Sequence, residues 1–259
     1  MNPEMRQHQD AARALACLDL TDLGDAATAE GALALCVAAR APRKVAAVCL
    51  WPRFVALASR ELARSGVKVA TIANFPSGEE KPASVRATIE KALEDGADEV
   101  DVVIPYRHLI AGRKTSTRTL LRTARAAVLP PARLKVILET GAYTVPSLIG
   151  DAARIAIEEG ADFLKTSTGK SEVSATPPAA RLLLEAAKAA GRPVGVKISG
   201  GVRSLADATI YLSLADEILG PDFVAPSTFR FGASSLRASL LAALGEDTTR
   251  EKKRESLAY

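Results

Sequence analysis

The sequence has few of the residues that build metal centres, disulfides or membrane spans. Among its 259 residues are three Cys and two His, with no CxxC pair and no His partner at metal-ligand spacing. This scarcity argues against a zinc site or a disulfide framework and predicts reduced thiols in a cytoplasmic protein. No uninterrupted apolar stretch reaches the ~18 residues of a membrane span, and the first ten residues lack an apolar export core. We therefore expect no metal, no cofactor, no membrane partner and no export.

The sequence also lacks a large excess of either positive or negative charge. The net charge is only +4, with a pI near 9.0, and much of the excess comes from Arg250, Lys252, Lys253 and Arg254. Nucleic acid is therefore not an expected partner. A composition of 48% hydrophobic and 25% charged residues is enough to bury a full core. The charged, weakly apolar tail over 246–259 is expected to be mobile outside that core.

What the sequence does contain is a regular alternation of short apolar segments and longer Ala-rich segments. We predict strands at 15–20, 44–50, 67–73, 98–104, 134–139, the apolar start of 161–170, 194–198 and 227–233. We predict helices at 28–39, 52–62, 82–93, 116–128, 146–159, 178–190 and 204–214, with a last helix opening after Ser235.

Eight strand segments, each followed by a helical one, predict a single-domain α/β protein, a (β/α)₈ TIM barrel over residues 1–245. Right-handed crossovers would place every strand's carboxyl end at one rim, where barrel enzymes keep their chemistry. A doubly wound open sheet is the structural competitor. It usually carries a GxGxxG-type first turn, and no such turn follows the early strands.

The segment ADFLKTSTGK, residues 161–170, places a lysine where a buried strand ends. Burial favours the neutral form of an amine, and a neutral Lys165 can attack a carbonyl and form a Schiff base. The alternative is a structural lysine that extends its head into solvent. Three more charges interrupt apolar strands, namely Asp19, Asp101 and Lys197.

These four residues should converge inside the barrel mouth, because isolated buried charges are costly. Lys165 and Lys197 lie on adjacent predicted strands, so the ammonium of Lys197 should favour the neutral form of Lys165. Asp101 would hold a proton-relay position opposite them. The alternative, a purely structural ion-pair network, leaves the neighbouring loops unexplained.

Those loops are rich in Gly, Ser and Thr after the last three strands, where barrels commonly bind phosphate. Each loop alone could be an ordinary turn. Together they predict a phosphate site built from Thr168, Gly169, Lys170, Gly200, Gly201, Arg203, Ser234 and Ser235.

The segments CLDLTDL, NFPSG, GADEVDVVIPY, LKVILETG, GADFLKTSTGK, VKISGGVR and RFGASS, spread over about residues 13 to 244, resemble the deoxyribose-phosphate aldolase family. The resemblance implies a class I aldolase on a (β/α)₈ barrel. By it, Lys165 matches the Schiff-base lysine, Lys197 the lysine that perturbs it, and Asp101 the aspartate that works with a bound water. Asp19 matches a supporting aspartate, and the Gly and Ser positions together with Lys170 match the phosphate pocket.

The family reaction is the reversible cleavage of 2-deoxy-D-ribose 5-phosphate to acetaldehyde and D-glyceraldehyde 3-phosphate, in deoxyribonucleoside catabolism. The partners implied are these small molecules and a second copy of the chain in a homodimer. Another class I aldolase of a phosphorylated sugar would share the lysine. A non-catalytic phosphometabolite or nucleic-acid binder would form no trappable adduct.

Three residues add open questions. Ile198 stands beside Lys197 where a smaller residue or proline is expected, so it could restrict the pocket. Tyr259 ends the chain, and some members of the family carry a C-terminal tyrosine that reaches the active site; the alternative is a disordered last residue. Cys49 is expected to be a core thiol, and its place near the rim leaves open a reaction with electrophilic aldehydes.

Overall fold

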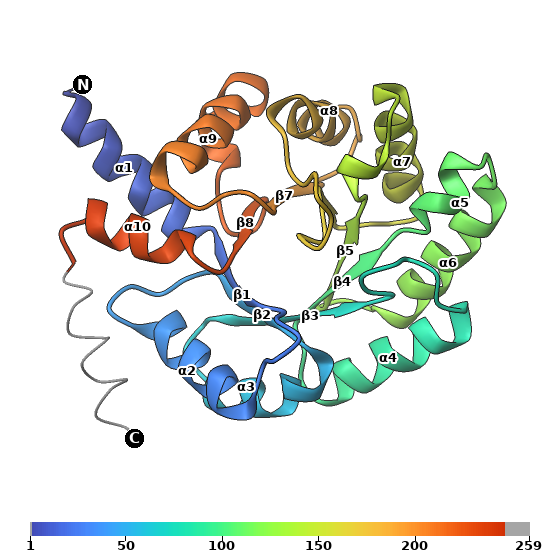
Figure 1. Ribbon diagram of the computed structural model, residues 1–259, viewed down its shortest axis with the longest axis horizontal. Helices are drawn as coiled ribbons and strands as arrows, with labels where there is room; N and C mark the ends of the chain where they lie inside the picture. Colours follow the sequence, from blue (N-terminus) through green and yellow to red (C-terminus); the bar gives the residue numbers. More distant parts are fainter. Residues whose placement is uncertain (1, 247–259) are drawn as a thin grey trace.

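The computed structural model describes residues 2–246, which form a closed barrel of parallel strands in chain order (Figure 1). Each strand pairs with the next, and the last pairs with the first. The strands are β1 (Leu18–Asp22), β2 (Ala47–Leu50), β3 (Lys68–Ala73), β4 (Glu99–Val103), β5 (Arg133–Ile137), β6 (Phe163–Lys165), β7 (Gly195–Ser199) and β8 (Phe229–Ala233). The predicted (β/α)₈ barrel is confirmed.

Helices surround the strands on the outside (Figure 1). Side-chain caps mark several helix starts, including Thr28, Thr176 and Ser204, whose oxygens accept from backbone N–H groups of the first turn. The helices are α1 (Pro3–Ala16), α2 (Ala29–Arg40), α3 (Val55–Glu61), α4 (Pro82–Glu94), α5 (Tyr106–Ile110), α6 (Lys114–Ala127), α7 (Pro146–Glu158), α8 (Pro177–Lys188), α9 (Leu205–Leu219) and α10 (Leu236–Ala243). Short 3₁₀ turns occupy Pro52–Phe54, Thr140–Ala142 and Pro221–Phe223.

The sequence-based assignment missed α1 and α5. Residues 15 and 16, predicted as strand, belong to α1, which ends two residues before β1 begins. Asn2 caps α1 by accepting from the backbone N–H of Glu4. Arg13 then ties α1 to α9 through an ion pair with Asp216 at 2.5 Å. The extra helix therefore packs on the outer ring and leaves the barrel itself unchanged.

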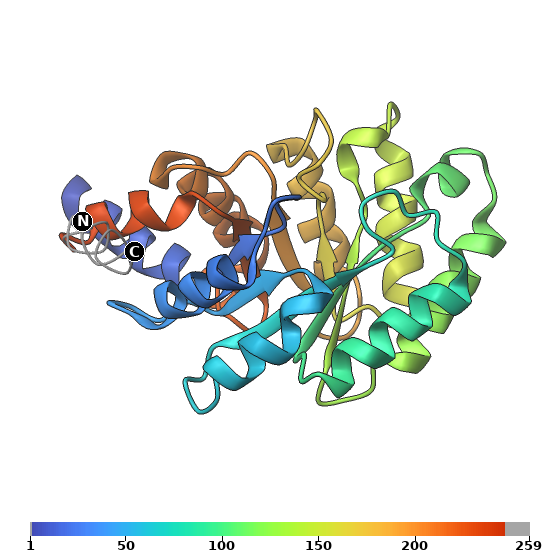
Figure 2. The same ribbon diagram turned by 60° about the horizontal axis from the view of Figure 1, so that its bottom comes forward.

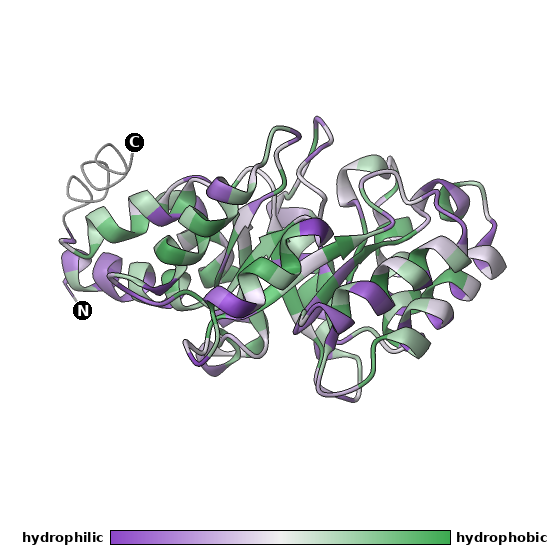
Figure 3. Cartoon of the chain, turned by 90° about the horizontal axis from the view of Figure 1, so that it is seen from below, coloured by the Kyte–Doolittle hydropathy of each residue, from purple (hydrophilic) through white to green (hydrophobic). Residues whose placement is uncertain are grey.

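The main hydrophobic core lies between the strands and the helices. Green apolar strands and purple outer helix faces show this layering in Figure 3. A smaller apolar cluster of Leu23, Cys49, Ala70 and Ile72 is separate from the main core. Cys49 is fully buried, and burial raises the pKa of its thiol, as expected for a core cysteine. No helix within residues 2–246 has the length and apolarity to cross a membrane.

Strand register determines which side chains meet inside the barrel. Asp101 is paired with Lys135 across β4 and β5, and Lys165 with Lys197 across β6 and β7. Lys197 is in turn paired with Arg230 on β8. Side chains alternate between the two faces of a strand, so paired residues point to the same side of the sheet. Since all strands are parallel, the loops after their carboxyl ends gather at one end of the barrel (Figure 2).

Candidate active site

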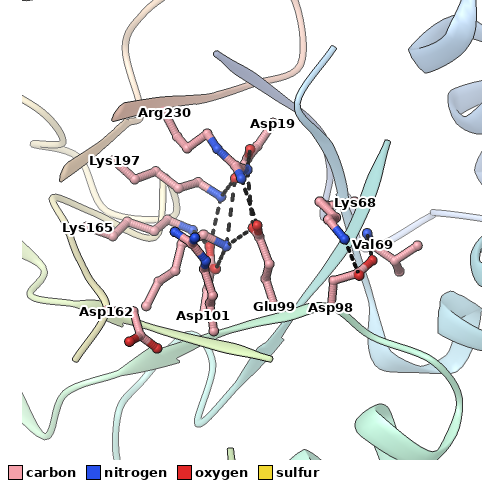
Figure 4. A network of polar contacts seen from close by, with 12 residues as sticks. Asp19, Lys68, Val69, Asp98, Glu99, Asp101, Asp162, Lys165, Lys197 and Arg230 are labelled. Atoms are coloured by element: carbon pink, nitrogen blue, oxygen red, sulfur yellow. Dashed lines mark hydrogen bonds and ion pairs between the residues drawn. The ribbon is translucent and has the colours of Figure 1, made fainter. Parts of the chain in front are cut away.

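A cluster of charged side chains fills the middle of the barrel (Figure 4). Each member is at most 3% exposed, although a strand interior normally carries apolar residues. In the part of the chain that the structure describes, the cluster has four basic and three acidic members: Lys135, Lys165, Lys197 and Arg230 with Asp19, Glu99 and Asp101.

Asp101 lies at the centre of this cluster. Its Oδ2 atom accepts hydrogen bonds from the Nζ atoms of both Lys165 and Lys197, each at 2.9 Å. Its Oδ1 atom accepts from Lys135 Nζ, also at 2.9 Å. The sequence-based expectation that Asp101 and the two lysines converge is thus met by direct contact, with one carboxylate oxygen shared between Lys165 and Lys197.

Lys197 is held between two carboxylates. Besides Asp101, its Nζ atom lies 2.6 Å from Asp19 Oδ2, so Asp19 joins the cluster as expected. Burial alone disfavours the ammonium, but Asp101 and Asp19 outweigh it and raise the pKa of Lys197 well above its usual value. Gly232 makes room for the lysine, because a Cβ atom there would lie 2.8 Å from Lys197 Cε. Lys197 is therefore a fixed cation.

Three members of the cluster were not singled out from the sequence. Lys135 Nζ lies 2.5 Å from Glu99 Oε2. Arg230 bonds Asp19 through Nη1 and lies 2.7 Å from Glu99 through Nη2. The signal was present: Glu99 and Asp101 are two residues apart on one strand and so share a face, and Lys135 interrupts an apolar segment just as Lys197 does.

The cluster should make the stability of the protein depend on pH. Burial disfavours the Asp101 carboxylate, yet the neighbouring lysines, Lys135 foremost, hold the pKa of Asp101 well below its usual value. A depressed pKa gives stability that is present above the unfolded-state value of about 4 and is lost as pH falls below it. The raised pKa of Lys197 gives stability that is complete below about 10.4 and is lost as pH rises through the folded-state value.

We therefore expect this contribution to be constant between about pH 5 and pH 9 and to decline below about pH 4. Urea midpoints measured at a series of pH values test this. The acid-side decline should be shallower in Asp101→Asn than in the wild type, since the variant cannot take up that proton. Equal slopes in the two proteins would contradict the assignment.

A cavity of about 410 Å³ opens beside the cluster at the carboxyl ends of the strands. All the residues predicted to bind phosphate line it, together with Lys165. Asp19, Asp101 and Lys197 do not line it, so among these four predicted residues only Lys165 reaches both the buried cluster and the cavity. The lining positions brought together are Thr168, Gly169, Lys170, Gly200, Gly201, Arg203, Ser234 and Ser235.

Lys170, which lines the cavity, forms an ion pair with a carboxylate from another loop. Lys170 Nζ, from the loop after β6, lies 3.0 Å from Asp25 Oδ1 in the loop after β1. The Asp25 side chain is 92% exposed, so the pair contributes little to stability and Lys170 is available to an anion.

Two further expectations have different outcomes. Ile198 is fully buried in the main hydrophobic cluster and is not among the residues that line this cavity, so it does not narrow it directly. Tyr259 lies outside the described residues. Within residues 2–246, no three His, Cys, Asp or Glu side chains are grouped so as to hold a metal ion.

Comparison with known proteins places the chain beside aldolases. A family profile described as DeoC/LacD family aldolase matches residues 13–242. A curated protein of Agrobacterium fabrum (strain C58), named deoxyribose-phosphate aldolase, is 45% identical over 241 residues, which covers 92% of this chain and 93% of that protein.

Solved structures show the same fold. An apo-form candidate deoxyribose-phosphate aldolase of Toxoplasma gondii ME49 superposes with a TM-score of 0.86 at 29% identity, covering 94% of this chain and 99% of that one. The deoxyribose phosphate aldolase of Aeropyrum pernix, described as tetrameric, superposes with a TM-score of 0.68 at 24% identity, covering 93% and 97% of the two chains.

Proposed function

The chain belongs to the DeoC/LacD aldolase family, and from that premise we propose the reaction it catalyses and the residues that carry it. The reaction is the reversible cleavage of 2-deoxy-D-ribose 5-phosphate to acetaldehyde and D-glyceraldehyde 3-phosphate, through a Schiff base. One observation carries the assignment of the nucleophile. Lys165 belongs to the buried charged cluster, through its bond to Asp101, and also lines the cavity that the Gly- and Ser-rich loops surround.

Charge balance supports Lys165 as the neutral amine. With four bases and three carboxylates in the described cluster, the charges cancel when one base gives up its proton. Lys135 and Lys197 each contact at least two carboxylates, whereas among residues 2–246 the one carboxylate that Lys165 contacts is that of Asp101. Lys165 therefore gives up the fewest ion pairs when it becomes neutral, and a neutral amine is the form that attacks a carbonyl.

The cleavage then follows from the chemistry of an imine. Neutral Lys165 Nζ adds to the C1 aldehyde of the open-chain sugar, and loss of water from the carbinolamine gives an iminium. Removal of the proton on the C3 hydroxyl forms the C3 carbonyl and breaks the C2–C3 bond. The electron pair of that bond becomes the C1=C2 double bond of an enamine, and the π pair of the iminium moves onto its nitrogen. D-glyceraldehyde 3-phosphate departs. Protonation of the enamine carbon and hydrolysis of the resulting iminium release acetaldehyde and restore the amine.

Asp101 and Lys197 are placed to serve the proton transfers. Asp101 touches Lys165 directly and can pass protons at the carbinolamine and enamine stages, in concert with water from the cavity. Lys197 remains charged and keeps Asp101 ionised. Its ammonium lies on the other side of the Asp101 oxygen that Lys165 also contacts. Asp19 holds Lys197 from its other side.

The phosphate of the substrate would occupy the far wall of the cavity. Glycine loops at Gly169 and Gly200–Gly201 let a phosphate approach the backbone closely, and Ser234 and Ser235 precede α10. Lys170 and Arg203 supply positive charge at the rim. This arrangement separates the ends of the substrate, with the aldehyde at Lys165 and the phosphate on the loops.

A substrate comparison tests the proposed function against its closest rival. Cleavage of 2-deoxy-D-ribose 5-phosphate is measured by coupling the triose phosphate to a dehydrogenase, beside an equal concentration of fructose 1,6-bisphosphate. We expect cleavage of the first and none of the second. Preferential cleavage of the bisphosphate would assign the chain to a different class I aldolase, and no cleavage of either would favour a non-catalytic phosphometabolite binder.

We propose that Tyr259 enters the cavity during turnover and assists proton transfer. Its support is the family resemblance, together with the cavity beside Lys165 at the carboxyl ends of the strands, where proton transfers would take place. Deleting Tyr259 should lower kcat by roughly a hundredfold, the low end of general acid–base contributions, with little change in stability. An unchanged kcat would show that the last residue has no catalytic part.

The assembly and the cellular setting are also proposals. From the resemblance we infer a homodimer acting in the cytoplasm in deoxyribonucleoside catabolism, with acetaldehyde and a phosphorylated sugar as its small-molecule partners and no nucleic acid. The relative from Aeropyrum pernix is described as tetrameric, so sedimentation equilibrium of the full chain should separate the two states.

A further inference from the structure

Glu139 is a buried carboxylate that the mechanism above does not use. It follows β5, is 3% exposed, and has a left-handed backbone with φ of 54°, a conformation that costs energy for a residue other than glycine. No Lys, Arg or His side chain among the described residues forms an ion pair with it. A buried carboxylate without a cation needs hydrogen-bond donors to compensate its charge.

Those donors all come from the loop after β6. Glu139 Oε2 accepts from Thr168 Oγ1 at 2.5 Å and from the Thr168 backbone N–H at 3.3 Å. Glu139 Oε1 accepts from Ser171 Oγ at 2.8 Å. Thr168 Oγ1, in turn, accepts from the backbone N–H of Lys170 at 3.1 Å. One carboxylate therefore fixes the two ends of the segment that carries Gly169 and Lys170.

The backbone next to Glu139 supports the same loop. The N–H of Thr140 donates to the carbonyl of Thr166 at 2.9 Å. A Cβ atom on Gly141 would lie 2.0 Å from the carbonyl oxygen of Val173, so only glycine lets the two segments touch. Residues 139–141 thus hold the loop after β6 by hydrogen bonds and close packing.

The charge of Glu139 cannot serve to attract a phosphate, because like charges repel. We therefore look for its role in the conformation that it imposes on the loop. The hydroxyl proton of Thr168 is directed at Glu139, so Thr168 contributes to the cavity by holding the loop and not by donating its hydroxyl to a ligand. This refines the phosphate-binding role expected for Thr168.

We propose that Glu139 is a positioning residue for the phosphate of the substrate, acting through the loop 167–171 and leaving the chemistry at Lys165 untouched. The proposal rests on the proposed aldolase function. It predicts that removing the carboxylate weakens recognition of a phosphorylated sugar and leaves the reaction of the same sugar without phosphate almost unchanged.

The test compares kcat/KM for 2-deoxy-D-ribose 5-phosphate and for 2-deoxy-D-ribose in the wild type, Glu139→Ala and Glu139→Gln. Removing an acceptor of several hydrogen bonds should lower the phosphorylated-to-free ratio by about tenfold or more in Glu139→Ala, through a higher KM. Glu139→Gln keeps an oxygen for Thr168 and should recover most of the ratio. Inhibition by inorganic phosphate should weaken in parallel.

Glu159→Ala is the matched control. Its side chain is 7% exposed, accepts from Arg118 and Arg122 on the outer ring, and is not part of the cavity lining. This variant should lose stability with no change in the ratio. An equal loss on both substrates in Glu139→Ala, with the wild type active, would contradict the proposal. A wild type that cleaves neither sugar would instead refute the proposed function.

Ser171→Ala keeps the inference testable if Glu139→Ala does not fold. It deletes only the 2.8 Å bond to Glu139 Oε1, from an exposed residue. A fall of several-fold in the same ratio is expected, on the scale of one ordinary hydrogen bond, and an unchanged ratio would contradict the positioning role.

Discussion

Lys165→Met is expected to eliminate cleavage of 2-deoxy-D-ribose 5-phosphate while leaving the fold intact. The variant keeps the apolar stem of the side chain and deletes the amine, so no iminium can form at this position. Loss of a covalent nucleophile should lower kcat by roughly 10⁴-fold or more. A coupled assay at high enzyme concentration measures the residual rate. The substrate should still bind, because the loops that line the phosphate end of the cavity are unchanged.

The same variant tests the charge balance of the buried cluster. If Lys165 is the neutral base, removing it leaves three bases and three carboxylates, and stability should change by no more than about 1 kcal/mol. Lys197→Met removes a fixed cation and leaves Asp19 and Asp101 undercompensated, which should cost about 3–5 kcal/mol. Equal destabilisation of the two variants would contradict the balance, and substantial cleavage by Lys165→Met would overturn the mechanism. Lys188→Met, on the exposed surface of α8, controls for the substitution itself.

Asp101→Asn should produce the second largest effect, because one carboxylate contacts the amino groups of three lysines. The amide keeps the shape of the side chain but loses its charge and one acceptor. Breaking buried ion pairs in this way should destabilise the fold by about 3–5 kcal/mol. Proton transfer at Lys165 should slow as well, with kcat lower by roughly 10²- to 10⁴-fold, the range for a general acid–base group.

Asp98→Asn provides the comparison, since Asp98 directly precedes β4, the strand that carries Asp101. Asp98 pairs with Lys68 at 2.8 Å and accepts from the backbone of Val69, as Figure 4 shows, but its side chain is 37% exposed. Its loss should cost about 1 kcal/mol or less and should leave kcat unchanged. Urea unfolding gives the stability of each variant, and steady-state kinetics give kcat. If Asp101→Asn matched Asp98→Asn in both measurements, Asp101 could not be the centre of the cluster.

The sequence predicted the barrel because eight short apolar segments are each followed by a longer helical segment. Short β6 was found because Phe163 and Leu164 run directly into Lys165. Helix α1 was missed because its apolar end, Leu15 and Ala16, adjoins β1 with one residue between, so the two apolar segments read as one.

Inside the site, the sequence analysis located four of the charged residues that interrupt the strands and missed the other three. Lys135 and Arg230 were passed over, and only strand register showed that they face Asp101 and Asp19. Glu139 could not be found by pattern, since its role depends on the path of a loop almost thirty residues later. A left-handed backbone at a glutamate has no signature in one sequence.

Borohydride reduction in the presence of acetaldehyde, followed by peptide mapping, tests the central claim most directly. Reduction converts the iminium to a stable ethylated lysine, which mass spectrometry assigns to one residue. We predict a single modification, on the peptide that contains Lys165, and none on Lys135 or Lys197. An ethyl group on a different cluster lysine, or no adduct at all in an enzyme that still cleaves the sugar phosphate, would contradict the account.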